Sequence, residues 1–517
     1  MFQGTVGSVC ELTGYTGLRV QGYSLVFHLQ GTGSTECPLA VREYLVQELR
    51  RLKSRNLLDM PYATMDAEKI IGDSSTAVTL VQGLVPAGAP AGERFDVEVA
   101  ALEGTQTISL QGGVLMPTRL QVVVAGQGAG MLAARATATA EGPVFINPFP
   151  QGPEAAPKAD PRRGVVLGGG RTRYDRDIRL ALLQPDYRTA QQIQNRINGR
   201  FQRPGDPRAA EATREMVQLR VPETYRDRYG HFVSLVWALF LQDRAGFQDR
   251  KLAELNEAVA KPDADYEAIA LAWEAIGKPA LPQLERLYLQ PQLGEPAYWA
   301  ARVALNLDDR RVIDVLIRLA SDTNHPSRLR AAQALAEVPD DPRARIALHQ
   351  LLGQNDYRLR LLGYEGLRKG RDATVSSSPL GQDFALDVVD VPGQPIVAVW
   401  ATVEPRIILF GKDLRLPPNV FFSSSDESVT LNARSGDEQM TVTRKLAGGN
   451  RLVTAKSSFV PADLIRLLAA GQEGGDRGGA VPPLSFSQLA GVLYQLCQQE
   501  VLAARFQLHR LPEDLVR

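Results

Sequence analysis

The chain has 517 residues, of which 44% are hydrophobic and 22% charged, the proportions of ordinary globular protein. Lysine and arginine together number 58, as do aspartate and glutamate, so the formal net charge is zero, without the basic surplus of nucleic-acid-binding proteins. The longest apolar run, residues 232–241, is about half the length of a membrane span, so no membrane-spanning helix is predicted.

Residues 20–33 predict a β-strand that ends in a sharp turn. Ser24, Val26 and His28 alternate with Leu25, Phe27 and Leu29, which gives the period of two that is typical of a strand. Gly31-Thr32-Gly33 follows and supplies the backbone freedom that a sharp turn requires. An apolar stripe at helical spacing then runs through residues 39–52, which indicates an amphipathic helix.

The first 150 residues predict a β-rich domain with one or two helices. Glycine and proline separate its strand-like runs, which lie at 77–82, 94–101, 113–124 and 131–140. The glycines of residues 126–130 are interpreted as a hairpin loop, because their spacing departs from that of a dinucleotide-binding motif. Six prolines between residues 142 and 163 indicate a linker.

Residues 151–245 predict a second, α/β block with a βαβ-like order. Strands are expected at 165–170, 177–183 and 216–221, and a helix with apolar residues at helical spacing at 187–201. Gly168-Gly169-Gly170 is interpreted as a turn or as a close backbone contact between subunits.

A helical repeat occupies residues 246–372. The dipeptides that mark it are separated by 29, 30 and 32 residues: Ala275-Ile276, Ala304-Leu305, Ala334-Leu335 and Gly366-Leu367. Each lies in a helix that is followed by a break and a second helix, at 281–289, 312–319 and 344–352. Helix pairs of this period stack into an α-solenoid and resemble short HEAT-like repeats. An irregular helical bundle is the alternative.

Strands return in residues 380–517. They are expected at 384–391, 397–403, 406–410 and 429–433, before a helix at 461–470, a glycine-rich loop at 471–483 and a final helical segment at 484–509. The predicted fold class is therefore α+β, with β-rich mixed domains and βαβ-like units interrupted by an inserted α-solenoid.

No motif in the sequence supports catalysis, a cofactor or a metal site. A phosphate-binding loop needs a lysine after its glycines, whereas Glu36 lies near that position. The histidines have no metal-ligand partner at helical spacing: His28, His231, His325, His349 and His509. The three cysteines form no Cys-x-x-Cys pair, and whether Cys10 and Cys37 form a disulfide stays open.

Four ordered blocks resemble the bacterial flagellar P-ring protein family. The first is GYSLVFHLQGTG at residues 22–33, and the second covers residues 89–102 and 109–118. The third is LALLQPDYRTAQQIQNRINGRF at 180–201, with Val221-Pro222 after it, and the last covers 399–416 and 484–502. The helical repeat lies where family members have only a short connection, so it is interpreted as an inserted domain.

The resemblance implies a structural, non-enzymatic role. Copies of the chain would form a homo-oligomeric ring in the periplasm, a bushing around the flagellar rod at the peptidoglycan layer, with the rod and the outer-membrane L ring as partners. Family precursors carry a secretion signal that is not visible here, so completeness of the N-terminus stays open.

Two glycine-rich segments are candidate subunit contacts: Gly31, Thr32 and Gly33 in the first turn, and Pro90, Gly92 and Arg94 in the loop at 86–94. The inserted repeats are expected to project and bind an envelope partner, since solenoids present extended surfaces. The alternative functions are an envelope adaptor that works through these repeats, and an enzyme acting on the cell wall, which would need an acidic cluster or metal site.

Overall fold

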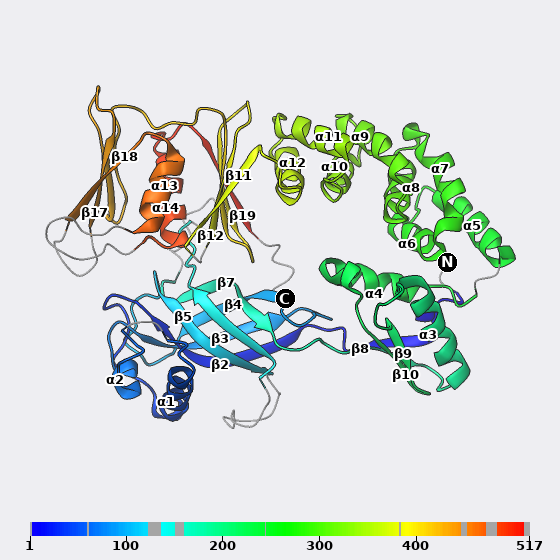
Figure 1. Cartoon of the computed structure of the whole chain (residues 1–517), viewed down its shortest axis with the longest axis horizontal. Coiled ribbons are helices and arrows are strands. Elements are labelled where there is room, and N and C mark those ends of the chain that lie inside the picture. Colours follow the sequence, from blue (N-terminus) through cyan, green and yellow to red (C-terminus); the bar gives the residue numbers. More distant parts are fainter. Residues whose placement is uncertain are drawn as a thin grey trace. The chain divides into compact units, whose positions relative to one another are not determined.

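The computed structural model describes residues 3–58, 61–122, 136–149, 160–242, 245–381, 384–445, 452–471 and 483–510. The chain forms two compact units (Figure 1). The first unit comprises Met1–Thr16, Ala87–Pro90 and Asp175–Val375, and the second Gly17–Pro86, Ala91–Tyr174 and Ser376–Arg517. The division into four consecutive domains (1–150, 151–245, 246–372 and 380–517) stays a prediction.

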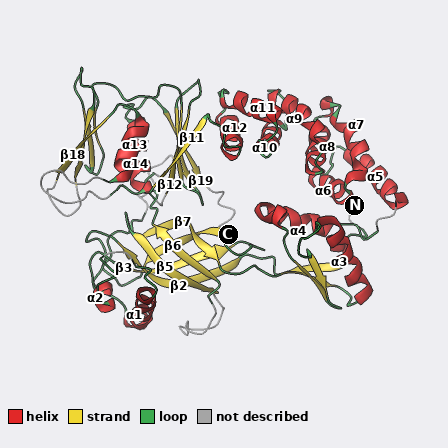
Figure 2. Ribbon diagram, in the orientation of Figure 1, coloured by secondary structure: helices red, strands yellow, loops and turns green. Residues whose placement is uncertain are grey.

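A closed, six-stranded antiparallel barrel lies in the second unit (Figure 2). In spatial order its strands are β2 (Leu18–Phe27), β3 (Ala77–Val85), β4 (Arg94–Ala101), β7 (Arg163–Thr172), β6 (Ala138–Pro143) and β5 (Val114–Val122). Closure pairs every strand on both sides and leaves no free edge. Of the strand predicted at 131–140, residues 131–135 lie outside the described residues, as do the glycines at 126–130 and residues 150–159 of the proline-rich linker.

Strand β2 is buried on both of its faces at its C-terminal end. Its last four residues, 24–27, are all buried. Leu25 and Phe27 belong to a core with α1 (Leu39–Ser54) and α2 (Ala67–Ile71). The Ser24 hydroxyl shares a hydrogen bond with the Thr118 hydroxyl of β5. Ser24, a polar member of the pattern, is therefore enclosed as well, whereas His28, just beyond the strand, is exposed.

Two further sheets and two helices complete the second unit. The first sheet has the order β11 (Val375–Leu380), β12 (Phe384–Val389), β14 (Arg406–Phe410), β13 (Ile396–Ala401), β19 (Arg505–Arg510). The second has the order β15 (Phe421–Ser423), β16 (Val429–Asn432), β17 (Met440–Lys445), β18 (Leu452–Ser457). Helices α13 (Pro461–Ala470) and α14 (Phe486–Gln498) share one hydrophobic core with both sheets.

The helical segment predicted at 484–509 is correct only in its first part. Helix α14 ends at Gln498, and residues 505–510 form β19, which pairs in parallel with β13. Phe506 and Leu508 alternate with polar residues, which is the period of a strand. Their pairing partners lie about a hundred residues earlier in the chain, so tertiary pairing decides the outcome.

The first unit begins with a four-stranded antiparallel sheet. Its order is β1 (Cys10–Thr13), β8 (Ile178–Leu182), β10 (Met216–Leu219), β9 (Ala210–Ala212). Helix α3 (Tyr187–Phe201) follows its N-cap, Asp186, whose side chain accepts a hydrogen bond from the Thr189 N–H. The turn η2 (Glu223–Arg228) and helix α4 (Tyr229–Ala238) follow.

A run of helices, which we call the helical array, completes the first unit. Its members are α5 (Ala245–Val259), α6 (Tyr266–Ile276), α7 (Leu281–Tyr288), α8 (Glu295–Asn306), α9 (Ile313–Ser321), α10 (Arg328–Ala336), α11 (Pro342–Leu352) and α12 (Tyr357–Lys369). Each dipeptide of the repeat lies at or near the C-terminal end of a helix. The predicted α+β fold with a helical insertion is confirmed, while the HEAT-like identity stays a prediction.

None of the helices among the described residues is long and apolar enough to cross a membrane.

Candidate functional site

The turn that contains Gly31, Thr32 and Gly33 is closed by hydrogen bonds from its own chain. The Thr32 hydroxyl donates to the Leu29 and Ser109 carbonyls, each at 2.8 Å. The N–H groups of Thr32 and Gly33 donate to the carbonyls of Leu29 at 3.0 Å and Ser74 at 2.8 Å. These N–H groups are therefore already satisfied, which gives a second physical reason why the loop is not a phosphate cradle.

The two glycines of this turn have different requirements. Gly31 has φ +89° and is exposed, and a Cβ added there would meet no atom within 4 Å. Gly33 is buried, and a Cβ there would overlap the Thr76 carbonyl oxygen and lie 2.7 Å from that of Ser74. Gly33 is therefore needed for packing within the fold. Gly31 is needed only because its backbone adopts a positive φ, and it lies at an exposed position.

The second candidate segment belongs to both units, because residues 87–90 count with the first and residues 91–94 with the second. Pro90 is half-buried. Gly92 is exposed at φ +85°, with open space where a Cβ would lie, and its N–H donates to the Thr172 carbonyl at 2.9 Å. The exposed Arg94 donates through Nε to the Gly168 carbonyl at 2.9 Å.

Gly168 marks a β-bulge between β4 and β7, where Phe95 pairs with Gly170 but Val97 pairs with Val166. The Gly168 N–H donates to Asp96 at 2.6 Å. Burial raises the pKa of Asp96 above its usual value, although the Gly168 N–H and the Arg94 charge act in the opposite direction.

Only glycine suits the position of Gly168. Its φ is +57°, and a Cβ would overlap the Val403 carbonyl oxygen, which lies beyond the barrel in the second unit. The triple glycine thus makes a close backbone contact within the chain. Gly170 has a related role, because its missing side chain leaves room for the ring of Phe95, which would approach a Cβ to 2.5 Å.

The groups that catalysis would use are dispersed. Across the described ranges, no cluster of three or more His, Cys, Asp or Glu side chains is placed to hold a metal ion. All three cysteines are free, so Cys10 and Cys37 are not joined in the structure. Burial raises the pKa of the Cys10 thiol to about 11 and that of Cys497 to about 12, which disfavours the nucleophilic thiolate.

Comparison with known proteins gives one family. The model of the family described as Flagellar P-ring protein matches residues 5–246. Among curated proteins, the Flagellar P-ring protein of Geobacter metallireducens is 31% identical over 237 residues, which cover 43% of this chain and 58% of the relative. That of Aquifex aeolicus is 30% identical over 213 residues, covering 40% and 52%.

The resemblance to the flagellar P-ring family is confirmed for residues 5–246. The chain spans little more than half the length of the curated relatives that it matches. The P-ring match includes the barrel, the four-stranded sheet, α3 and α4, and so takes in parts of both units. The blocks at 399–416 and 484–502 lie beyond it, and their likeness to the P-ring family stays a prediction.

The P-ring match ends at Gly246, inside the first turn of α5, so the helical array lies outside it. A buried polar cluster joins the array to the matched part of the first unit. Glu274 of α6, whose side chain is only 5% exposed, lies 2.8 Å from Nε2 of His231 in α4 and accepts a hydrogen bond from Asn306 of α8 at 2.9 Å. Arg200 of α3 donates to the Glu274 carbonyl at 3.2 Å.

The charge of Glu274 is held by its partners. Burial raises the pKa of this carboxyl, but the hydrogen bond and charge of His231, with Asn306 and Arg200, outweigh that effect and hold the pKa below its usual value. Removing any one partner would leave this buried charge partly uncompensated and would destabilise the fold. A second link is the ion pair of Arg228 in η2 with Glu337, the C-cap of α10, at 3.8 Å.

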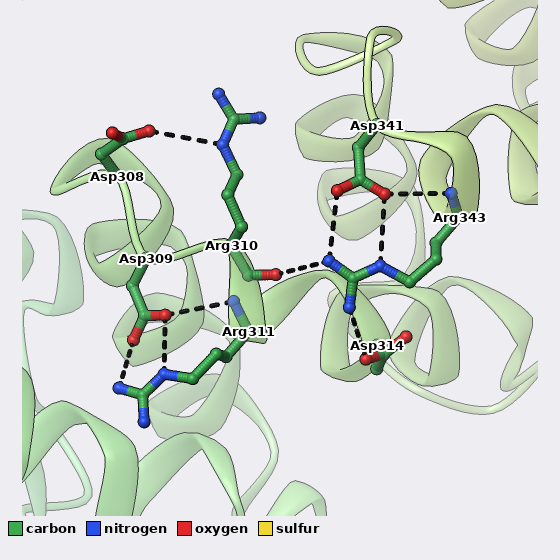
Figure 3. A network of polar contacts seen from close by, with 7 residues as sticks. All are labelled: Asp308, Asp309, Arg310, Arg311, Asp314, Asp341 and Arg343. Carbon is green, nitrogen blue, oxygen red and sulfur yellow. Dashed lines mark hydrogen bonds and ion pairs between the residues drawn. The ribbon is translucent and has the colours of Figure 1, made fainter.

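Within the array, an Asp-x-Arg pattern lies at the start of the second helix in each of two successive helical hairpins (Figure 3). Asp341 is the N-cap of α11, and its Oδ1 accepts the Arg343 N–H at 2.9 Å, while its two oxygens accept from the same guanidinium at 3.2 and 3.1 Å. Arg343 also donates to Asp314 of α9 at 2.7 Å. Asp309 and Arg311 repeat this geometry 32 residues earlier and reach Glu285 of α7 at 2.9 Å. Each arginine thus couples one hairpin to the preceding one.

Sequence reasoning missed these polar contacts. The interval of 32 residues between Asp309 and Asp341 is a signal that could have found the arginine pairs. The cluster around Glu274 has no such signal, because its four members come from separate helices. No comparable local pattern indicates the bond between Asp96 and Gly168.

Proposed function

We propose that this chain is a structural, non-enzymatic subunit of the flagellar basal-body P ring. The observation that carries the proposal is the match of residues 5–246 to that family. Copies would assemble into a homo-oligomeric ring in the periplasm, at the peptidoglycan layer, and serve as a bushing for the flagellar rod. The rod, the outer-membrane L ring and peptidoglycan are the partners that this role implies.

A bushing needs a stiff subunit and contacts that close on themselves. The closed barrel supports stiffness, since its strands have no free edge to fray or to pair at random. A ring requires heterologous contacts, in which one surface of each copy binds a different surface of the next. Gly31 and Gly92 are the best placed of the six candidate residues, because both are exposed with open space above them.

The proposal is tested on the purified full chain by size-exclusion chromatography and negative-stain electron microscopy. Closed rings of uniform diameter are expected. The variant Gly31→Asn adds bulk at an exposed position while keeping a residue that tolerates positive φ, so it should reduce ring formation and leave the barrel folded. Rings from the variant as abundant as those from the unaltered chain would remove Gly31 from the contact, and monomers from the unaltered chain would overturn the proposal.

The second candidate function is an envelope adaptor that binds a partner through the helical array. The array's extent, eight helices packed in sequence within the described part of the chain, favours an exposed binding surface. This function predicts a monomer whose partner binding is lost on substitution within the array, whereas ring assembly requires no partner.

A further inference from the structure

Charge is distributed unevenly along the helical array. Residues 249–267, in α5, α6 and the turn between them, contain six acidic and three basic side chains. Residues 357–371, in α12 and the turn after it, contain five basic side chains and one acidic. We call these segments the acidic end and the basic end.

The two segments are the two ends of the array in space as well as in sequence. Helix α5 packs mainly on α6, while α12 packs on α10 and α11, with the other helices between them (Figure 1). Neither segment is therefore a neighbour of the other within one copy of the array.

Several charges in the middle of the array are paired across helices. Four ion pairs between helices lie at 3.1 Å or less: Glu285–Arg311, Asp314–Arg343, Glu295–Arg330 and Arg302–Glu337. Each pair joins two different helices or the turn or cap next to one, so these opposite charges hold the array together.

Several charges at the ends are exposed and have no ion pair of this kind, whereas Arg360 of the basic end is buried. Within the ranges that the structure describes, no ion pair involves these acidic-end side chains: Asp249, Glu257, Asp263 and Glu267. The same holds, for the described residues, at the basic end: Arg358, Lys369 and Arg371. The array thus has unpaired negative charge at one end and unpaired positive charge at the other.

We propose that the acidic end of one copy docks on the basic end of the array in a second copy, head to tail. The occupant is a second copy because this chain itself supplies both complementary surfaces. Opposite charges steer such ends together, and like ends repel. The contact is heterologous, since two different surfaces meet, and contacts of this kind build rings or open filaments. It goes beyond the P-ring assignment, because every residue involved lies outside the matched region.

The test uses charge reversal at each end and at both ends of the full chain. The acidic-end variant is Glu257→Arg with Glu267→Arg, the basic-end variant is Arg358→Glu with Lys369→Glu, and the third variant combines all four changes. Self-association is measured by sedimentation velocity at about 50 mM and about 300 mM NaCl, which differ in how strongly they screen exposed charges. Each single-end variant should associate roughly tenfold more weakly at low salt. The combined variant should recover, because its ends are again complementary.

Three controls make the outcomes distinct. Arg318→Glu reverses an exposed charge in α9, in the middle of the array, and should leave association unchanged. Circular dichroism confirms folding, and Glu257→Gln with Glu267→Gln supplies a milder acidic-end variant if reversal unfolds the chain. The combined variant failing to recover, or an unaltered chain whose association ignores salt, would overturn the proposal.

The same series separates the proposal from its competitors. If only the basic-end variant weakens self-association, and it also abolishes binding to polyphosphate added as a probe, then the basic end binds an anionic polymer. The proposal of a head-to-tail contact would then be refuted. Rings that persist by microscopy in every variant would leave the P-ring proposal intact while refuting this one.

Discussion

Gly33 and Gly31 allow the contribution of one turn to folding to be separated from its contribution to assembly. Alanine at Gly33 places a methyl group against two backbone carbonyls, those of Ser74 and Thr76. Both carbonyls belong to the backbone of the connection between α2 and β3, which moves less readily than a flexible side chain. We therefore expect a cost in the free energy of unfolding of about 3 kcal/mol, the upper part of the range for overpacking.

Alanine at Gly31 is the matched comparison. Space around its Cβ is open, so only the positive φ is penalised, at about 1 kcal/mol. Differential scanning calorimetry of the full chain measures both variants, and the barrel transition should fall by roughly 6–12 °C for Gly33→Ala and by roughly a third of that for Gly31→Ala. Hydrogen exchange of the β3 amides assigns the effect to the barrel.

Two results would refute this reasoning. Equal destabilisation by the two substitutions would mean that the crowding around Gly33 does not determine its cost. A Gly33→Ala chain as stable as the unaltered one would mean that the Thr76 carbonyl is free to move away.

Three further predictions follow from the buried and paired groups. The pKa of the Glu274 carboxyl is depressed from 4.5 in the folded chain. The ionised carboxylate therefore stabilises the fold above pH 4.5, and this stabilisation is lost as the pH falls below that value. Glu274→Gln should flatten the dependence of stability on pH in acid-unfolding curves. Asp341→Ala removes an N-cap and should cost about 1 kcal/mol in denaturant unfolding, with Asp341→Asn costing less because the amide oxygen still accepts; equal losses would contradict the capping role. Cys497 is partly buried and burial raises its pKa to about 12, so it should react with iodoacetamide at pH 8 more slowly in the native chain than in the unfolded chain; labelling of the native chain at the rate of a free thiol would contradict this shielding.

Much of the secondary structure was predictable because local patterns determine it. The helices at 187–201 and 461–470 have the predicted bounds, since each has a clear start, an Asp N-cap or a proline in the first turn, and a regular apolar stripe. The helices of the array follow from the repeat interval for the same reason.

Pairing between distant segments was not predictable. Strand β1 at residues 10–13 pairs with β8 near residue 180, and β19 pairs with β13 across about a hundred residues. Local sequence carries no signal for such partners, and it is their pairing that makes residues 505–510 a strand. The two discontinuous units have the same origin, because the chain returns twice to segments that it left earlier.

The sequence predicted which glycines of the candidate site lie in turns, but not what each glycine contacts. Gly31, Gly33 and Gly92 all lie in tight turns, as the glycine spacing indicates. Which of them faces the chain's own backbone depends on the connection between α2 and β3, because the Ser74 and Thr76 carbonyls lie against Gly33. Their part in subunit contacts stays a prediction.

The way the array is attached bears on both proposals. Glu274 contacts α3, α4 and α8, and Arg228 reaches Glu337 at the C-cap of α10. The array is therefore fixed to the P-ring-matched part of the first unit by buried and exposed polar contacts. A flexible tether would let each array sample many orientations and would oppose a defined contact between copies through lost entropy. A fixed array repeats its orientation in every copy, so its acidic and basic ends can meet at one geometry. Disrupting the anchor with His231→Ala should therefore weaken the salt-sensitive association even though His231 belongs to neither end; unchanged association would show that the anchor and the contact are independent.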